Sequence, residues 1–320
     1  MTAPALSRNP LAGLPAFRAG TSALVVAAPA KLNLFLEVVA KRPDGYHDLE
    51  SLMVGIDLFD TLELRATANG EVELVCEPTG LSTGPDNLVH KAATALKAHT
   101  GRSDLGAHVR LTKRVPVQAG LGGGSSDAAA ALAGLNEIWK LGLTRETLHA
   151  MAASVGSDVA FFHSLPAAWC KGRGEVTTPE PAPATGFEFV VVCPAVGLAT
   201  AGVFKRLTVP NAPVSGDAVR KAFSAGDPEA LGRALFNRLE APAEEVAPAV
   251  GRIRQRLAAL GPCGARMSGS GSSVFAVCRD RAHASEIASA FVESRPSDEP
   301  ESKVYLFRSL SPSSAVGGVR

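Results

Sequence analysis

A glycine-rich segment is the first part of the chain whose residue types and spacing indicate chemistry. Four of the five residues from Gly120 to Gly124 are glycine, and Ser125 and Ser126 follow directly. Glycine leaves backbone N–H groups open to an anion, and a helix that begins there adds unpaired N–H groups and its positive end. Two serine hydroxyls at the same place could bind phosphate or Mg²⁺. The segment therefore predicts a phosphate site.

The surrounding residues favour this interpretation over a flexible linker, because a predicted strand precedes the glycines and a predicted helix follows them. The segment is not a Walker A motif, since no lysine stands before the serines, and the chain lacks protein-kinase signatures. We expect phosphate to bind at this segment, which consists of Pro116, Val117, Gln118, Ala119, Gly120, Leu121, Gly122, Gly123, Gly124, Ser125 and Ser126.

Lys31 and Asp158 are the residues best suited to phosphoryl transfer itself. That reaction needs alignment, stabilisation of negative charge and a group that takes the proton of the acceptor hydroxyl. A carboxylate beside an ammonium stays ionised near neutral pH, and the ammonium can bind the transferring group. Taken alone, each residue has an ordinary alternative, since Asp158 could cap a helix and Lys31 could lie on a solvated strand face.

The elements that would position these residues can be read from the hydrophobic pattern. Residues 22–40 predict a long strand whose alternation places Lys31 and Asn33 on one face and Leu32, Leu34 and Leu36 toward a core. Ser157 and Asp158 are expected to cap a short helix that ends at Phe162.

Further elements complete the N-terminal half. Residues 60–66 and 71–77 flank Asn69 and Gly70, which predicts an antiparallel hairpin. Residues 86–100 predict a helix with Asp86 as N-cap and Gly101 as C-cap. Residues 107–115 predict the strand before the glycine loop, and the helix after the loop runs to Trp139.

Composition excludes several classes of protein. The 32 lysines and arginines balance 31 acidic residues, so no global charge favours nucleic acid or an anionic membrane. No apolar run is long enough to span a bilayer. The five cysteines form no CxxC pair, which argues against structural zinc and disulfides. We therefore expect a cytoplasmic protein of small-molecule substrates, with no nucleic-acid or membrane partner, that is a monomer or a weak homodimer.

Three segments, at 116–127, 156–162 and 267–272, resemble the motifs of the GHMP kinase superfamily. Within it, residues 29–36, 42–49 and 120–126 are similar to kinases that phosphorylate the 2-hydroxyl of 4-(cytidine 5'-diphospho)-2-C-methyl-D-erythritol, in the non-mevalonate route to isoprenoid precursors. The resemblance covers nearly everything after residue 20, and it implies ATP as co-substrate with Mg²⁺.

The resemblance also implies a fold and a division of the chain. The fold class is α+β, with an N-terminal domain like ribosomal protein S5 domain 2 and a C-terminal ferredoxin-like domain. We expect a flexible tail at 1–20, the ATP-binding domain at 21–165 and the C-terminal domain at 166–320. By the family pattern, Lys31 and Asp158 are the catalytic pair, and residues 116–126 form the loop that binds the phosphates of ATP. Gly269, Ser270 and Gly271 form a third-motif loop that closes the site.

The same resemblance implies a cytidine pocket with Asn33 beside it. Tyr46 stacks on the base, His47 hydrogen-bonds its edge, and Thr200 and Phe204 lie beside it. Aromatic rings and an imidazole suit a neutral pyrimidine. A turn position for His47 and a core position for Phe204 are the alternatives.

Three positions depart from the family pattern: Ala160 stands where proline is usual, Pro166 ends a loop that usually contains glycine, and Arg238 replaces an acid.

Two other functions remain open. One is a GHMP kinase for homoserine, mevalonate or a galactose-like sugar, against which Tyr46 and His47 argue. The other is a catalytically silent ATP-binding relative, which should lack the lysine or the aspartate.

Overall fold

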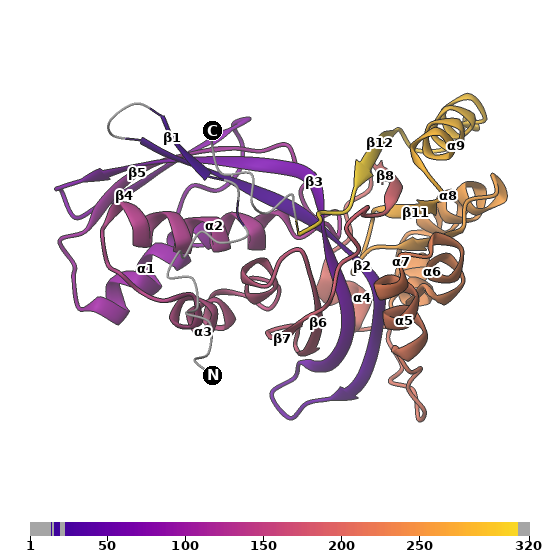
Figure 1. The fold of residues 1–320 in the computed structure, drawn as a ribbon, viewed down its shortest axis with the longest axis horizontal. Coiled ribbons are helices and arrows are strands. Elements are labelled where there is room, and N and C mark those ends of the chain that lie inside the picture. Colours follow the sequence, from indigo (N-terminus) through magenta and orange to yellow (C-terminus); the bar gives the residue numbers. More distant parts are fainter. Residues whose placement is uncertain (1–13, 15, 20–22, 313–320) are drawn as a thin grey trace.

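The computed structural model describes residues 14, 16–19 and 23–312, which form two β-sheets with helices packed on them. Figure 1 shows the first sheet with α1, α2 and α3 on one side of it, and the helices of the C-terminal half gathered around the second sheet. The predicted α+β class is confirmed.

The first sheet has eight strands within the described residues, and its main path runs in the order β1-β2-β3-β5-β4. β6 pairs with β3 and β7, whereas β9 pairs with β2. All pairs are antiparallel except β4 with β5 and β2 with β9. The strands are β1 Ala16–Ala19, β2 Ala23–Lys41, β3 His47–Thr67, β4 Val72–Glu77, β5 Gly106–Thr112, β6 Ala167–Gly172, β7 Val176–Pro179 and β9 Phe236–Asn237.

Helices α1 (Leu88–Thr100), α2 (Gly123–Ile138) and α3 (Arg145–Val155) cover one face of this sheet. Small side chains let α2 lie close to the strands, because Ala128 to Ala131 and Ala133 are fully buried and a Cβ at Gly134 would be 2.9 Å from Leu64. The apolar faces of β2, β3 and β5 complete this core. The sheet thereby fixes the start of α2, where the glycine loop ends.

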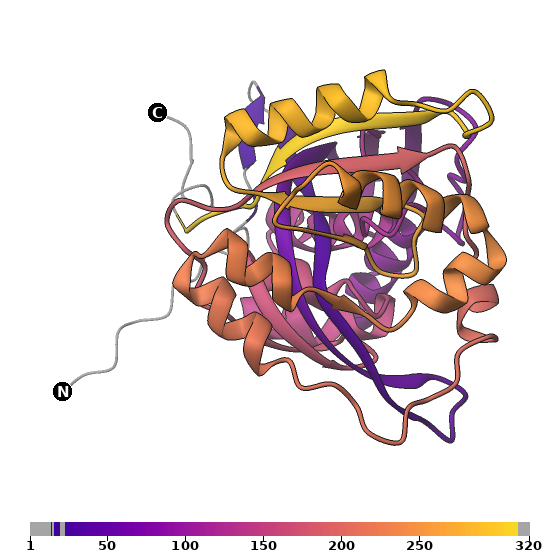
Figure 2. The same cartoon turned by 90° about the vertical axis from the view of Figure 1, so that its right-hand side faces the viewer.

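The second sheet has the order β10-β11-β8-β12 and is antiparallel. Successive residues of β8 point to opposite faces, so Phe189 and Val191 face one core and Val190 and Val192 face another. Figure 2 shows helices on both sides of these strands. The strands are β8 Glu188–Pro194, β10 Gly264–Met267, β11 Val274–Cys278 and β12 Ser302–Arg308, and the helices are α4 Thr200–Phe204, α5 Asp217–Ala225, α6 Pro228–Ala234, α7 Glu240–Val246, α8 Pro248–Ala259 and α9 Arg281–Glu293.

Several predicted details need correction. β3 and β4 do not form a hairpin, because β5 lies between them in the sheet. In the turn that follows β3, the Asn69 side chain accepts a hydrogen bond from the backbone N–H of Glu71. Asn87 rather than Asp86 caps α1, since its side chain accepts the N–H of Val89. Asp158 caps no helix: the 3₁₀ helix η1 (Ala160–His163) begins after Val159 and has no side-chain cap.

The predicted division into domains stays a prediction. Of the expected tail, residues 1–13, 15 and 20 lie outside the described residues, and residues 16–19 form β1 on the edge of the first sheet. β6 and β7 follow the expected boundary at 165/166 but belong to the first sheet, so the second sheet begins only at β8.

The five cysteines are free thiols, and all but Cys263 are buried. Among the described residues, no helix combines the length and apolarity needed to cross a membrane.

His163 is an unusual member of the N-terminal core. Its ring is 4% exposed, and Nε2 has no hydrogen-bond partner among the described residues. Its carbonyl accepts hydrogen bonds from the Arg145 guanidinium. Burial, together with the neighbouring His149 and Arg145, lowers the pKa of His163 from 6.5 to about 3. The folded protein therefore holds this ring neutral.

We predict that His163 makes the protein acid-sensitive. Because its folded pKa is depressed, the unfolded chain binds more protons between about pH 6.5 and pH 3, and stability is lost as the pH falls through that window. His163→Leu should flatten the fall by up to about 1.4 kcal/mol per pH unit. Urea unfolding at pH 7, 6 and 5 measures this slope. His99→Leu, at an exposed site, is the control, and equal slopes for His163→Leu and the parent chain would contradict the prediction.

Candidate active site

A cleft of about 1180 Å³ lies between the two halves of the chain. Strand β2, the β2–β3 turn, the glycine loop, α4 and the loop between β10 and β11 all contribute to its walls. Most of the predicted site residues line it, including both members of the proposed catalytic pair. Leu121 and Ser126 do not, because Leu121 packs in a hydrophobic core and Ser126 is buried in the first turn of α2.

Lys31 and Asp158 lie together on the floor of the cleft. Lys31 Nζ is 3.3 Å from Asp158 Oδ2 and donates a hydrogen bond to Asn33 Oδ1. The lysine side chain is nearly buried, whereas that of Asp158 is 30% exposed. The carboxylate therefore remains accessible from the cleft while the ammonium is fixed beside it.

Asn33 shares the face of β2 with Lys31, as the alternation of the strand predicts. Its Nδ2 donates to Ser51 Oγ at 2.8 Å, and the Ser51 hydroxyl donates to the Phe35 carbonyl at 2.7 Å. The Asn33 amide thus donates through Nδ2 and accepts through Oδ1, and the Ser51 bond fixes the direction of the oxygen that receives Lys31. The asparagine therefore positions the ammonium.

Close contacts require glycine at several positions of the predicted phosphate loop, residues 116–126. Gly120 and Gly122 have φ values of +74° and +70°, in the left-handed region that glycine tolerates. A Cβ on Gly120 would be 2.1 Å from the Ser268 carbonyl, and one on Gly122 would be 2.9 Å from Lys31 Cγ. At Gly123 a Cβ would meet Val115 and Lys113, not the open cleft.

The loop between β10 and β11 contacts the phosphate loop directly. Ser268 Oγ donates to the Gly120 carbonyl at 2.9 Å and accepts from the Asn33 N–H at 3.3 Å. Gly269, Ser270 and Gly271 of this third-motif loop line the cleft. The Ser270 hydroxyl is 2.9 Å from that of Thr200 at the start of α4.

A buried cluster beside the phosphate loop was not predicted from the sequence. Lys113 Nζ contacts the carboxylates of Asp60 and Asp127, the latter at 2.7 Å. Burial, against the opposing effect of Lys113, raises the pKa of Asp127 to about 7. Burial also opposes the charge of Lys113, but the two carboxylates together raise its pKa. Lys113 precedes the phosphate loop in sequence, whereas Asp60 lies 53 residues before Lys113.

The predicted cytidine-pocket residues line the same cleft. The rings of His47 and Phe204 stack on one another, with centroids 5.0 Å apart and planes at 30°. Tyr46 is half-exposed, and the Arg173 guanidinium lies 5.0 Å from its ring centroid. Burial and the nearby Lys41 lower the pKa of His47, so its ring is neutral at pH 7.

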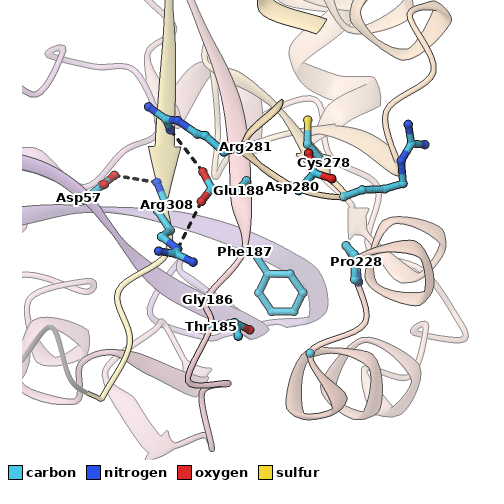
Figure 3. A pocket seen from close by; sticks show the side chains of 12 residues that line it. Asp57, Thr185, Gly186, Phe187, Glu188, Pro228, Cys278, Asp280, Arg281 and Arg308 are labelled. Atoms are coloured by element: carbon cyan, nitrogen blue, oxygen red, sulfur yellow. Dashed lines mark hydrogen bonds and ion pairs between the residues drawn. The ribbon is translucent and has the colours of Figure 1, made fainter. Parts of the chain in front are cut away.

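A second cavity of about 550 Å³ lies near the ends of β8 and β12 (Figure 3). Arg281 and Arg308 both point toward Glu188, at 3.3 Å. The backbone N–H of Arg308 donates to Asp57 at 2.7 Å. Two arginines that line this cavity pair with Glu188, and the lining includes none of the predicted site residues. The cleft is therefore the candidate active site.

Comparison with known proteins shows the family of this chain. Residues 87–164 match the GHMP kinases N-terminal domain, and residues 219–296 match the GHMP kinases C-terminal model. A 4-diphosphocytidyl-2-C-methyl-D-erythritol kinase of Pelotomaculum thermopropionicum is 40% identical over 288 residues, which cover 89% of this chain and 97% of that protein. The chain belongs to the 4-diphosphocytidyl-2-C-methyl-D-erythritol kinase family. Another member, from Geobacter metallireducens, is 40% identical over 79% of this chain and 88% of its own length.

Solved structures agree with this family assignment. A crystal structure of a 4-(cytidine 5'-diphospho)-2C-methyl-D-erythritol kinase matches with a TM-score of 0.73 and 31% identity, over 89% of this chain and 99% of that one. Homoserine kinase from Cytophaga hutchinsonii has a TM-score of 0.74 at 18% identity, which shows a shared fold alone, over 92% of this chain and 98% of that one. The predicted two-domain GHMP kinase fold is confirmed.

Two of the departures from the family pattern have clear surroundings. Ala160 is fully buried at the start of η1, where it packs in the N-terminal core. Arg238 binds both carboxylate oxygens of buried Glu37, at 2.8 and 2.7 Å. The arginine thus satisfies a carboxylate on β2, and an acid at 238 would face that carboxylate without a counter-charge.

Proposed function

We propose that this chain transfers the γ-phosphoryl group of ATP to the 2-hydroxyl of 4-(cytidine 5'-diphospho)-2-C-methyl-D-erythritol, giving the 2-phosphate and ADP. Membership of a kinase family implies ATP as the co-substrate. The single observation that carries the proposal is the Lys31–Asp158 pair, which lies in one cleft together with the glycine loop and the Tyr46–His47 turn. Three parts that this reaction needs are therefore adjacent.

In the proposed mechanism Asp158 accepts the proton of the 2-hydroxyl. The hydroxyl oxygen attacks the γ-phosphorus as the bond from phosphorus to the ADP oxygen breaks. Lys31 stabilises the negative charge on the transferring group, because its ammonium is held within 3.3 Å of the base and is shielded from water. N–H groups of the phosphate loop and of the first turn of α2 hold the phosphates.

Mg²⁺ belongs to this proposal as well. Ser126 Oγ and Asp127 Oδ1 are buried at the first turn of α2 without a hydrogen-bond partner among the described residues. Oxygen donors of this kind suit Mg²⁺, which usually binds few protein ligands together with substrate phosphates. Those two side chains would hold the ion, which would neutralise phosphate charge.

Location in the cytoplasm, absence of nucleic-acid partners and a monomeric or weakly dimeric state remain predictions.

Substrate choice tests the proposal directly. We expect ADP release with 4-(cytidine 5'-diphospho)-2-C-methyl-D-erythritol and none above background with methylerythritol phosphate, homoserine or mevalonate. The physical reason is that only the first ligand offers a pyrimidine for the Tyr46–His47 turn. Turnover of homoserine or mevalonate alone would assign the chain to a different GHMP kinase activity, and no turnover at all would favour a silent relative.

Variants of the catalytic pair test the mechanism. Asp158→Asn keeps the shape of the side chain but removes the proton acceptor, so kcat should fall by about 10² to 10⁴ with little change in KM. Lys31→Met should cost a comparable factor, because it removes charge stabilisation. The double variant should lose less than the product of the two effects, since the groups act together. Simple multiplication, or a near-normal kcat for Asp158→Asn, would be the contrary result.

The base pocket yields a separate prediction. Because His47 already stacks on Phe204, no ring fits between them, and we expect the base to stack on Tyr46 while Phe204 supports His47. Tyr46→Ala should raise KM for the cytidine substrate about 5 to 150-fold, which corresponds to about 1 to 3 kcal/mol. His47→Ala and Phe204→Ala should be strongly non-additive in that KM and should leave KM for ATP nearly constant. Independent, multiplicative effects would instead mean that Phe204 contacts the base by itself.

A further inference from the structure

Asn237 lies behind the third-motif loop, outside the cleft, and its side chain is almost fully buried. Nδ2 donates to the carbonyls of Met267 and Gly269, at 2.7 and 2.8 Å. Oδ1 accepts the N–H of Leu239 at 2.9 Å. Both amide hydrogens therefore bind the backbone that enters the loop, and the orientation of the amide is fixed by the third bond.

Glu240 strengthens the same attachment from the next turn of chain. Its Oε1 accepts the N–H of Met267 at 2.7 Å. Met267 is thus held through both its N–H and its carbonyl, directly before the loop begins. The entrance to the third-motif loop is consequently attached to the segment 237–240 rather than only to its own hairpin.

That segment is in turn attached to the strand that carries the catalytic lysine. β9 pairs with β2, with Asn237 opposite Leu36, and the Arg238 N–H donates to the Leu36 carbonyl at 2.8 Å. The Arg238 guanidinium binds Glu37, which is fully buried and also accepts the N–H groups of Val38 and Val214. β2 therefore sets the position of Asn237.

Holding the Gly269 carbonyl has a direct effect on the cleft. A peptide unit is planar and trans, so its C=O and the following N–H point in opposite directions. Fixing the Gly269 carbonyl toward Asn237 directs the Ser270 N–H away from Asn237, on the side where the loop lines the cleft. Gly269 itself lies against the catalytic pair, because a Cβ there would be 3.3 Å from Lys31 Nζ.

We propose that Asn237 is a positioning residue for phosphoryl transfer: it fixes the third-motif loop, through the Met267 and Gly269 carbonyls, relative to Lys31. This inference rests on the proposed kinase function. Asn237 touches no substrate, so its loss should misplace the loop in the reacting complex more than it weakens binding. A misplacement of about 1 Å can cost a factor of about 10² in rate.

The test uses two substitutions in the full chain. Asn237→Asp keeps the shape but sets a carboxylate oxygen against two carbonyl oxygens, and Asn237→Ala removes the amide without adding charge. We expect kcat to fall about 10 to 100-fold in both, with KM for ATP and for the cytidine substrate changed by less than about 3-fold. If the aspartate variant does not fold, the alanine variant decides.

Asn136→Asp is the matched control. Asn136 is similarly buried and its amide also binds loop backbone, at the N–H and carbonyl of Leu143, but that loop does not line the cleft. This variant should lower the melting temperature while kcat stays within about 2-fold of the parent. If Asn237 and Asn136 variants lose kcat equally, or if the Asn237 variants retain normal kcat, Asn237 is only structural and the inference fails.

A second readout does not depend on turnover. Amide hydrogen exchange in residues 268–273 should accelerate at least about 10-fold in Asn237→Ala, while α9 exchanges as in the parent chain. Unchanged exchange in the loop would overturn the inference even if kcat falls. A parent chain that fails to phosphorylate the cytidine substrate would overturn the proposed function instead, and the exchange result would still decide whether Asn237 holds the loop.

Discussion

The ammonium of Lys31 lies on a strand that is covered on both faces, and the rest of the site is arranged around it. Taking a charge out of water is costly unless counter-charge and hydrogen bonds replace the water. Asp158, in the segment that precedes η1, supplies the counter-charge, and Asn33, on the same strand as Lys31, supplies a hydrogen bond. The backbone N–H of Lys31 donates to the Leu121 carbonyl, so the glycine loop is attached to the same residue. One residue of β2 thus joins two other segments, the one that carries Asp158 and the glycine loop.

These attachments explain why loops with few apolar side chains keep a fixed shape. The phosphate loop and the third-motif loop contact one another through Ser268 and Gly120, at distances that a Cβ would not permit. Short loops of glycine and serine lose more conformational entropy on folding than other segments. Hydrogen bonds to β2 and to Asn237 offset that cost, and the sheet beneath supplies the rigidity that the loops lack.

The parts of the site that depend on local pattern could be predicted from the sequence, and the parts that depend on distant partners could not. Alternation along β2 places Lys31 and Asn33 on one face, and the strand, glycine loop and helix follow one another as expected. The insertion of β5 between β3 and β4, the contact of Lys113 with Asp60, and the stacking of His47 on Phe204 each join segments far apart in the chain. Period and propensity carry no information about such pairs. The proximity of Asp158 to Lys31 also depends on the fold, because the local sequence pattern around Asp158 is that of a helix cap.

β9 also bears on how the enzyme can move. A hinge rotation that separates β9 from β2 would pull the Arg238 guanidinium away from Glu37 and leave that buried carboxylate without its counter-charge, which is unfavourable. Hinge closure of the two halves is therefore energetically unfavourable for this chain. Ligands then bind in a cleft whose width is largely fixed, and the segments that can change conformation are the exposed β2–β3 turn and α4. Inhibitors of this cleft would then gain affinity mainly from rigid shape complementarity, since little of their binding energy is consumed in closing the protein around them.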